Sequence, residues 1–173
     1  MSKSALKKYV SGLKKRELEL QILDLYERFP QVKVFYDFAF NPKEDKLIGD
    51  AKARISNEYF PRKRKRPRAR RSVAQKLIRK FVTLGMDPYL LADLMLYNLE
   101  TAQRFSAVRK VNEAFYKSML RSYSEAANHL VLHSLEGEFR ERMEHIYGQI
   151  REQEWDFAEE FDRIRSTLTL TEL

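Results

Sequence analysis

The 173-residue chain has no cysteine, which excludes disulfide bonds, cysteine nucleophiles, zinc fingers and iron–sulfur clusters. It has no stretch that approaches the roughly 20 apolar residues of a membrane-spanning helix. The first ten residues include lysines but no apolar segment of signal-peptide length. We therefore expect a cytoplasmic protein without a membrane partner.

Glycine and proline are scarce, with five of each, and this disfavours an architecture rich in turns and strands. Apolar residues make up 43% of the chain, enough for a folded core, and charged residues make up 34%, which suits amphipathic helices. We predict an all-α fold with a single helical domain over residues 1–166. That domain contains a basic loop at 61–71, and a frayed C-terminal tail follows at 167–173.

Apolar residues recur at helical spacing along almost the whole chain. The pattern predicts about eight helices, near residues 4–11, 18–29, 32–40, 42–59, 67–84, 88–99, 108–135 and 138–165. Short connections between these helices favour antiparallel helical hairpins. Solenoid-like stacking of the hairpins stays open, because no repeat of fixed period is visible.

Local signals mark several helix ends. Asn41–Pro42 and Asp87–Pro88 are each typical of an N-cap followed by proline at the first helical position. Pro67 is expected to begin a helix in the same way, and Gly85 to end it. The helix after the second cap pair is apolar almost all round, which is typical of a buried central helix.

Charge is concentrated in one segment, the basic run from Arg62 to Arg71. The chain has 33 basic and 25 acidic residues, and outside the run the two counts are equal at 25. Pro61 and Pro67 bracket the first part of the run, so charge repulsion and the prolines predict an exposed loop. The run has eight basic residues and no acidic one: Arg62, Lys63, Arg64, Lys65, Arg66, Arg68, Arg70 and Arg71.

The partner that this run favours is a polyanion, because neutralised phosphates release condensed counterions. The planar group of arginine matches phosphate and also stacks on bases. The sequence contains no recognition helix, RNP-type aromatic strand or GXXG loop, so we expect electrostatic binding with RNA favoured over DNA. Anionic lipid is a weaker alternative, because no apolar face flanks the run. The resulting hypothesis is a non-enzymatic nucleic-acid-binding accessory protein, associated with RNA or the ribosome, that needs no cofactor.

Two other interpretations of the run stay open. The segment 136–173 has 5 basic and 11 acidic residues, so it could neutralise the run within the chain. Alternatively, the helical scaffold is a protein–protein adaptor whose basic loop binds an acidic partner.

Candidate metal and catalytic residues are few. His129 and His133 are four residues apart on one predicted helix, with Glu125 one turn earlier, but no HExxH motif is present and we expect no metal. Asp93 is an acid inside the most apolar helix, where burial could raise its pKa. With Glu100 it could also recruit the metal of a nuclease. A salt bridge from Asp93 to a neighbouring arginine is the simpler interpretation.

Six aromatic residues in two short segments, 35–40 and 59–60, are candidates for stacking on bases beside the run. Their helical spacing favours a place in the core instead. These residues are Phe35, Tyr36, Phe38, Phe40, Tyr59 and Phe60.

Over most of its length the chain resembles a family of small bacterial proteins classed as a domain of unknown function. The resemblance implies a bacterial cytoplasm as the setting, and it implies no activity, substrate or site residue. The segments that carry it are KVFYDFAFNP (Lys33–Pro42), RPRARRSVAQK (Arg66–Lys76), LGMDPYLLADLMLYNLE (Leu84–Glu100) and FYKSML (Phe115–Leu120).

Overall fold

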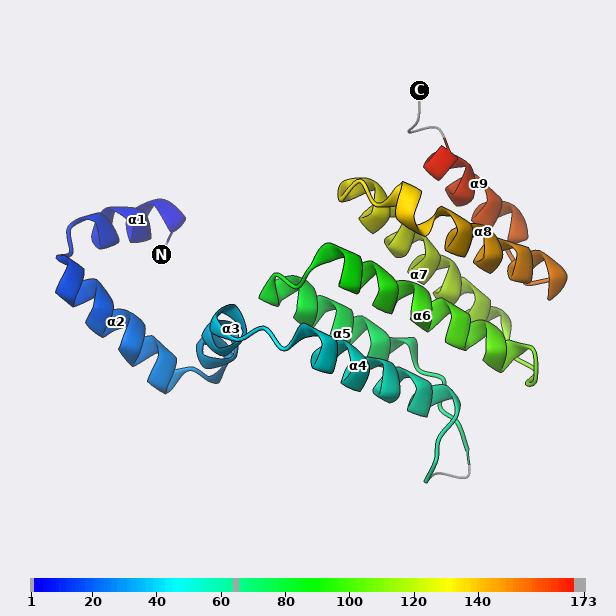
Figure 1. Cartoon of the computed structure of the whole chain (residues 1–173), viewed down its shortest axis with the longest axis horizontal. Coiled ribbons are helices and arrows are strands. Elements are labelled where there is room, and N and C mark those ends of the chain that lie inside the picture. The colour runs from blue at the N-terminus through cyan, green and yellow to red at the C-terminus, as the bar shows by residue number, and fades with distance from the viewer. Residues whose placement is uncertain (1, 64–65, 170–173) are drawn as a thin grey trace. The chain divides into compact units, whose positions relative to one another are not determined.

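The computed structural model describes residues 2–63 and 66–169, and these ranges contain nine helices and no strand (Figure 1). The all-α prediction is therefore confirmed. Among the described residues, no helix combines the length and apolar composition needed to cross a bilayer. The helices are α1 (Lys3–Ser11), α2 (Lys15–Arg28), α3 (Pro30–Phe40), α4 (Glu44–Tyr59), α5 (Arg71–Leu84), α6 (Pro88–Ser106), α7 (Glu113–Leu132), α8 (Glu136–Glu152) and α9 (Ala158–Thr169).

The chain divides into two compact units, Met1–Lys43 and Glu44–Leu173. The sequence predicted one helical domain over residues 1–166. In the first unit α2 packs against α3, and in the second α6 packs against α4, α5, α7 and α8. The tail predicted at 167–173 overlaps α9, which continues to Thr169. The last four residues of that tail lie outside the described ones.

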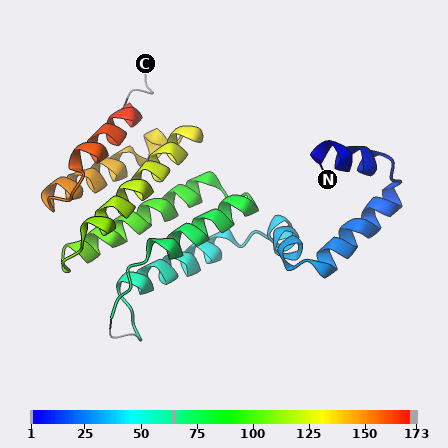
Figure 2. The same ribbon diagram turned by 180° about the vertical axis from the view of Figure 1, so that it is seen from behind.

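The central element of the second unit is α6, as its apolar sequence predicts (Figures 1 and 2). Leu94, Leu96 and Leu99 on this helix are fully buried. The core continues between α7 and α9, where the rings of Tyr123 and Phe161 lie 5.2 Å apart, centre to centre. The α4–α9 unit therefore has a continuous apolar interior that can hold surface loops in defined positions.

Two of the predicted helix ends are confirmed. The side chain of Asp87 accepts hydrogen bonds from the N–H groups of Tyr89 at 2.9 Å and Leu90 at 3.1 Å, so it caps α6. Gly85 follows α5 with a φ of +74°, a left-handed conformation that side chains with a Cβ disfavour.

Two other helices begin later than predicted. The fourth starts at Glu44 and not at Pro42, because Asn41 closes α3 as its C-cap and so cannot open the next helix. The seventh starts at Glu113, because the side chain of Asn112 caps its first turn. In both cases the sequence contains a local capping residue. Asn41 caps the end of the preceding helix, and Asn112 caps a helix that starts later than predicted.

The single helix predicted at 138–165 is two helices, α8 and α9. Glu154 and Phe157 have φ angles of +51° and +67°, which an α-helix does not contain. The turn between α8 and α9 places Trp155 in the core, where 3% of the residue is exposed. Burial of this large ring outweighs continuation of the helix.

The N-terminal unit differs from the rest, because no residue of α1, α2 or α3 is buried. Three short helices enclose too little volume for a core, as expected for such a small unit. Of the 16 large hydrophobic residues that are exposed in the described chain, ten lie here: Leu6, Tyr9, Leu20, Ile22, Leu23, Leu25, Phe29, Val34, Phe35 and Phe40.

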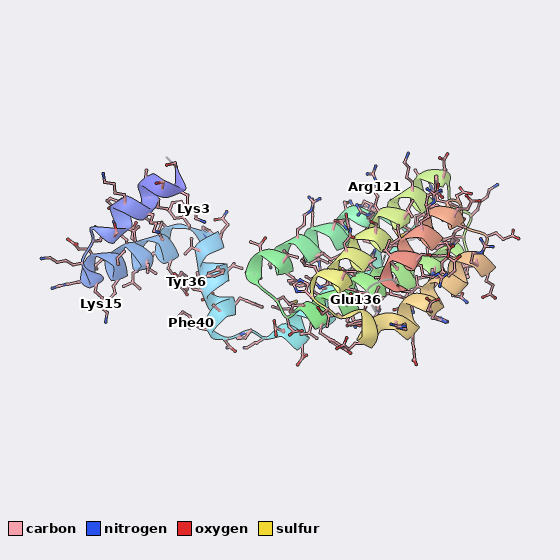
Figure 3. The ribbon with its side chains drawn as sticks, turned by 90° about the horizontal axis from the view of Figure 1, so that it is seen from above. Lys3, Lys15, Tyr36, Phe40, Arg121 and Glu136 are labelled. Carbon is pink, nitrogen blue, oxygen red and sulfur yellow. The ribbon has the colours of Figure 1, made fainter. Side chains whose placement is uncertain are left out.

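The predicted core position of the α3 aromatic residues is therefore wrong. Phe40 is 83% exposed and Phe35 is 46% exposed, while Tyr36 and Phe38 are half-buried. Tyr36 and Phe40 stack on each other with ring centres 6.0 Å apart (Figure 3).

Candidate nucleic-acid interface

The α4–α5 loop, residues 60–70, contains most of the basic run, and its returning end is held by Glu58 in the last turn of α4. The Glu58 carbonyl oxygen accepts hydrogen bonds from the N–H groups of Arg68 and Ala69, both at 3.0 Å. Its carboxylate accepts two more from Arg70, at 2.9 Å from Nε and 3.2 Å from Nη2. Glu58 is only 7% exposed, so this closure is anchored in the packed part of the unit.

The sequence predicted that this helix begins at Pro67, but α5 begins at Arg71. The closure on Glu58 explains the difference. Ala69 has a φ of +47°, in the left-handed region that an α-helix does not contain. The helix therefore starts only after this residue. Arg68 and Arg70 consequently lie in the loop and not on the opening turns of α5.

Arg71, the first residue of α5, is held by α7. Its Nε donates to the hydroxyl of Ser122 at 2.8 Å, and its Nη2 lies 2.7 Å from a carboxylate oxygen of Glu125. Only 19% of this side chain is exposed. Since Arg70 and Arg71 both have internal partners, we assign them to the scaffold that holds the loop.

The other residues of the run have a different environment. Arg64 and Lys65 lie outside the described residues. The remaining side chains are exposed and form no ion pair within the described chain: Arg62, Lys63, Arg66 and Arg68. This part of the loop therefore presents positive charge to solvent, as predicted from the sequence.

Acidic residues of segment 136–173 do not supply the ion-pair partners seen for the described part of the run. Those partners come from α4 and α7. Two acids of the segment pair instead with Arg165, at 3.1 Å from Glu144 and 3.0 Å from Asp162. The described contacts thus give no support to neutralisation of the loop by the acidic segment.

A second loop, the α6–α7 loop at residues 107–112, lies at the same end of the unit (Figures 1 and 2). Its Arg109 and Lys110 are exposed and form no ion pair within the described chain. Arg68 and Lys110 line one hollow of about 650 Å³. The two loops therefore form one cationic surface, although they are distant in the sequence.

An aromatic floor lies between the two loops. A hollow of about 330 Å³ is lined by Tyr59, Phe60, Pro61, Pro67, Phe105, Val108 and Arg109. Tyr59 is buried, as predicted, whereas Phe60 is 41% exposed and contradicts its predicted place in the core. The Phe60 and Phe105 rings lie 6.0 Å apart and cross at 73°.

The chain belongs to DUF6155, a family of unknown function. The match covers residues 1–169 and so includes all nine described helices. Searches of curated proteins and of solved structures found no significant match. The resemblance to a family of unknown function is therefore confirmed, and activity has to be argued from geometry.

In this DUF6155 member, Asp93 forms the salt bridge that the sequence favoured. Its carboxylate oxygens lie 2.6 Å from Lys52 Nζ and 2.7 Å from Arg142 Nη1. Arg142 Nη2 also donates to Glu100 at 2.9 Å. Burial favours the neutral acid, but the hydrogen bonds and charges of Lys52 and Arg142 outweigh it and lower the Asp93 pKa. The Asp93 pKa is thus lowered and not raised, and cationic groups pair with the carboxylates of both Asp93 and Glu100.

His129 lies on α7 and His133 is the C-cap of that helix, and their ring centres are 4.5 Å apart. His129 Nε2 is 2.9 Å from the carbonyl oxygen of Pro88, so this nitrogen carries the proton and donates. Burial lowers the His129 pKa from its ordinary value, which favours the neutral ring at pH 7. Glu125, the third candidate ligand, pairs with Arg71. Among the described residues, no group of three or more His, Cys, Asp or Glu side chains is placed to hold a metal ion.

Proposed function

We propose that this chain is a non-enzymatic nucleic-acid-binding accessory protein of the bacterial cytoplasm, with RNA favoured over DNA and the ribosome as the preferred setting. One observation carries the proposal. Arg62, Lys63, Arg66 and Arg68 are exposed and unpaired within the described chain, on a loop whose returning end is closed on Glu58. A loop with a fixed closure presents several cations to one strand with a smaller loss of conformational entropy than a free tail.

Arg109 and Lys110 of the α6–α7 loop extend the cationic surface. A strand that follows both loops would place several phosphates near cations, and each neutralised phosphate releases counterions. If five phosphates of a single strand are contacted, the logarithm of the binding constant falls against log salt with a slope of about −3.5. A slope near zero would contradict electrostatic binding.

The test compares two variants with the same net charge. The loop variant combines Arg62→Gln, Lys63→Gln, Arg66→Gln and Arg68→Gln. The control variant removes four exposed cations from α5 and α7 instead, by Lys76→Gln, Arg79→Gln, Lys80→Gln and Arg121→Gln. Because total charge is matched, a difference between the variants reports where the nucleic acid binds.

We expect the loop variant to bind a labelled single-stranded RNA about 200-fold more weakly at 0.15 M salt, since each of the four lost phosphate contacts removes about 0.7 from the salt slope. The control should remain within about threefold of the natural sequence, because its cations lie outside the contact surface. Fluorescence anisotropy measures the binding, and circular dichroism should show equal helicity in all three proteins. Equal losses in both variants, or no loss in the loop variant, would refute the proposal.

The adaptor hypothesis, in which the basic loop binds an acidic protein, has one observation in its favour. The N-terminal unit exposes ten large hydrophobic residues and buries none. Residues 1–43 also have nine basic and five acidic side chains, so an acidic partner with an apolar face would complement this unit as well as the loop. Purification at low ionic strength separates the hypotheses. Bound nucleic acid raises the ratio of absorbance at 260 nm to that at 280 nm, whereas an adaptor retains a stoichiometric acidic protein.

A further inference from the structure

Phe60 has an unusual position for a large apolar side chain of the α4–α9 unit. It is 41% exposed, whereas the adjacent Tyr59 is 2% exposed. Its N–H bonds to the carbonyl of Ser56 at 2.7 Å, so the backbone of Phe60 is still tied to α4. Its ring crosses that of Phe105 at 73° and is not stacked on it. Phe60 is therefore an aromatic residue whose backbone is fixed to α4 and whose side chain has much of its surface accessible to solvent.

Phe60 also forms a wall shared by two hollows. The hollow of about 330 Å³ is the aromatic and proline-rich one that Arg109 borders. The other has a volume of about 460 Å³ and is lined by Ala53, Arg54, Ser56, Asn57, Phe60, Arg62 and Tyr97. Both volumes fall in the range of about 300–1,000 Å³ typical of small-molecule sites. A flat group the size of a nucleobase can therefore enter either hollow and meet Phe60 there.

Cations border both of the hollows that Phe60 lines. Arg54 and Arg62 border the larger hollow, and Arg109 borders the smaller one. All three are exposed and form no ion pair within the described chain. An aromatic platform flanked by cations is the arrangement by which proteins hold single strands, with bases on the rings and phosphates on the charges.

We propose that Phe60 stacks on an unpaired base of a single-stranded nucleic acid whose phosphates contact Arg54, Arg62 and Arg109. This inference rests on the proposed function and narrows its ligand to single strands. In a duplex both faces of every internal base are covered by neighbouring pairs, so Phe60 has no base to contact along the duplex and only the cations engage. Phe60 therefore distinguishes single strands from duplexes, whereas the cations do not.

The experiment uses two substitutions of Phe60. Phe60→Leu keeps an apolar side chain against Phe105 but removes the aromatic face, and Phe60→Tyr keeps that face. Binding is measured by anisotropy with a labelled 12-nucleotide single-stranded RNA and with a 12-base-pair RNA duplex. Unlabelled inorganic polyphosphate, a polyanion without bases, is tested by its displacement of each probe.

We expect Phe60→Leu to weaken single-strand binding about tenfold, in line with the loss of one base stacked on an aromatic ring. Its binding to the duplex and to polyphosphate should be unchanged, and Phe60→Tyr should bind all three as the natural sequence does. The tenfold ratio should persist as salt is raised, because stacking does not depend on counterion release.

Two results would overturn the inference. Unchanged single-strand binding in Phe60→Leu would show that the ring does not contact a base. An equal loss for single strand, duplex and polyphosphate would show that the ring only supports the loop. Neither result affects the electrostatic proposal, which fails on different evidence, namely absence of salt-dependent binding to any of the three probes.

Discussion

Arg70 donates two hydrogen bonds to the carboxylate of Glu58, whereas Arg68, two residues earlier, uses only its backbone N–H to contact the same residue. The Arg70 side chain is thus directed into the scaffold, and the Arg68 side chain is directed to solvent. Two arginines that are close together in the basic run therefore have different roles. Arg70 holds the loop on the scaffold, and Arg68 presents its charge to solvent.

This difference predicts opposite effects of two matched substitutions. Arg70→Met leaves the buried carboxylate of Glu58 without its bidentate partner, so we expect a lower urea midpoint than for the natural sequence. Arg68→Met should leave the midpoint unchanged but weaken single-stranded RNA binding about fourfold at 0.15 M salt, the effect of one lost phosphate contact. Equal destabilisation by the two substitutions would contradict the assignment of Arg70 to the scaffold.

A second prediction concerns the acid of α6. Asp93→Asn removes the charge that pairs with Lys52 and Arg142, and we expect a loss of about 1–2 kcal/mol of unfolding free energy at pH 7, allowing for partial solvent screening. Urea denaturation measures this difference.

The pH dependence of that difference follows from the lowered pKa of Asp93. The unfolded chain binds the proton more readily than the folded one, so the stabilisation is fully present above the ordinary value of 3.8. It is lost as pH falls through the lower pKa of the folded state. The gap between the natural sequence and Asp93→Asn should therefore stay constant from pH 8 to pH 5 and narrow below pH 4. A gap that widens in acid would contradict the assigned direction.

Two glycines provide a matched test of backbone conformation. Gly85 has a φ of +74°, whereas Gly49 lies inside α4, and an added Cβ would meet no atom within 4 Å at either position. Gly85→Ala should destabilise the protein by about 1 kcal/mol, because a side chain disfavours the left-handed region. Gly49→Ala should stabilise it by about 0.5–1 kcal/mol, because alanine favours the helix. Thermal melts compare the two, and changes of the same sign would refute this account.

Much of the fold was accessible from local patterns. Helical spacing predicted the all-α class, and the caps at Asp87 and Gly85 act through contacts within a few residues. The start of α5 could not be predicted in this way. It depends on hydrogen bonds from Arg68 and Ala69 to Glu58, across the loop.

The candidate interface also combines features that the sequence predicts with features that it does not. The exposure of Arg62, Lys63, Arg66 and Arg68 follows from their charge density. The sequence did not predict that Arg109 and Lys110 contribute to this surface. These two cations follow the run by about 40 residues, and no local sequence pattern links them to it. Phe60 is among the candidates for stacking on bases, but its helical spacing favours a core position, so its exposure was not predicted.

The amino-acid sequence by itself determined the helical class, the central place of α6 and the concentration of positive charge in one loop. These follow from periodicity, apolar content and repulsion between like charges, which act along the chain. Only the tertiary structure decided that Arg70 and Arg71 face internal acids, that two distant loops share a surface, and that the N-terminal helices bury nothing. Those outcomes depend on which groups packing brings within a few ångströms of one another. Local sequence patterns do not show this, because the groups that meet are separated along the chain.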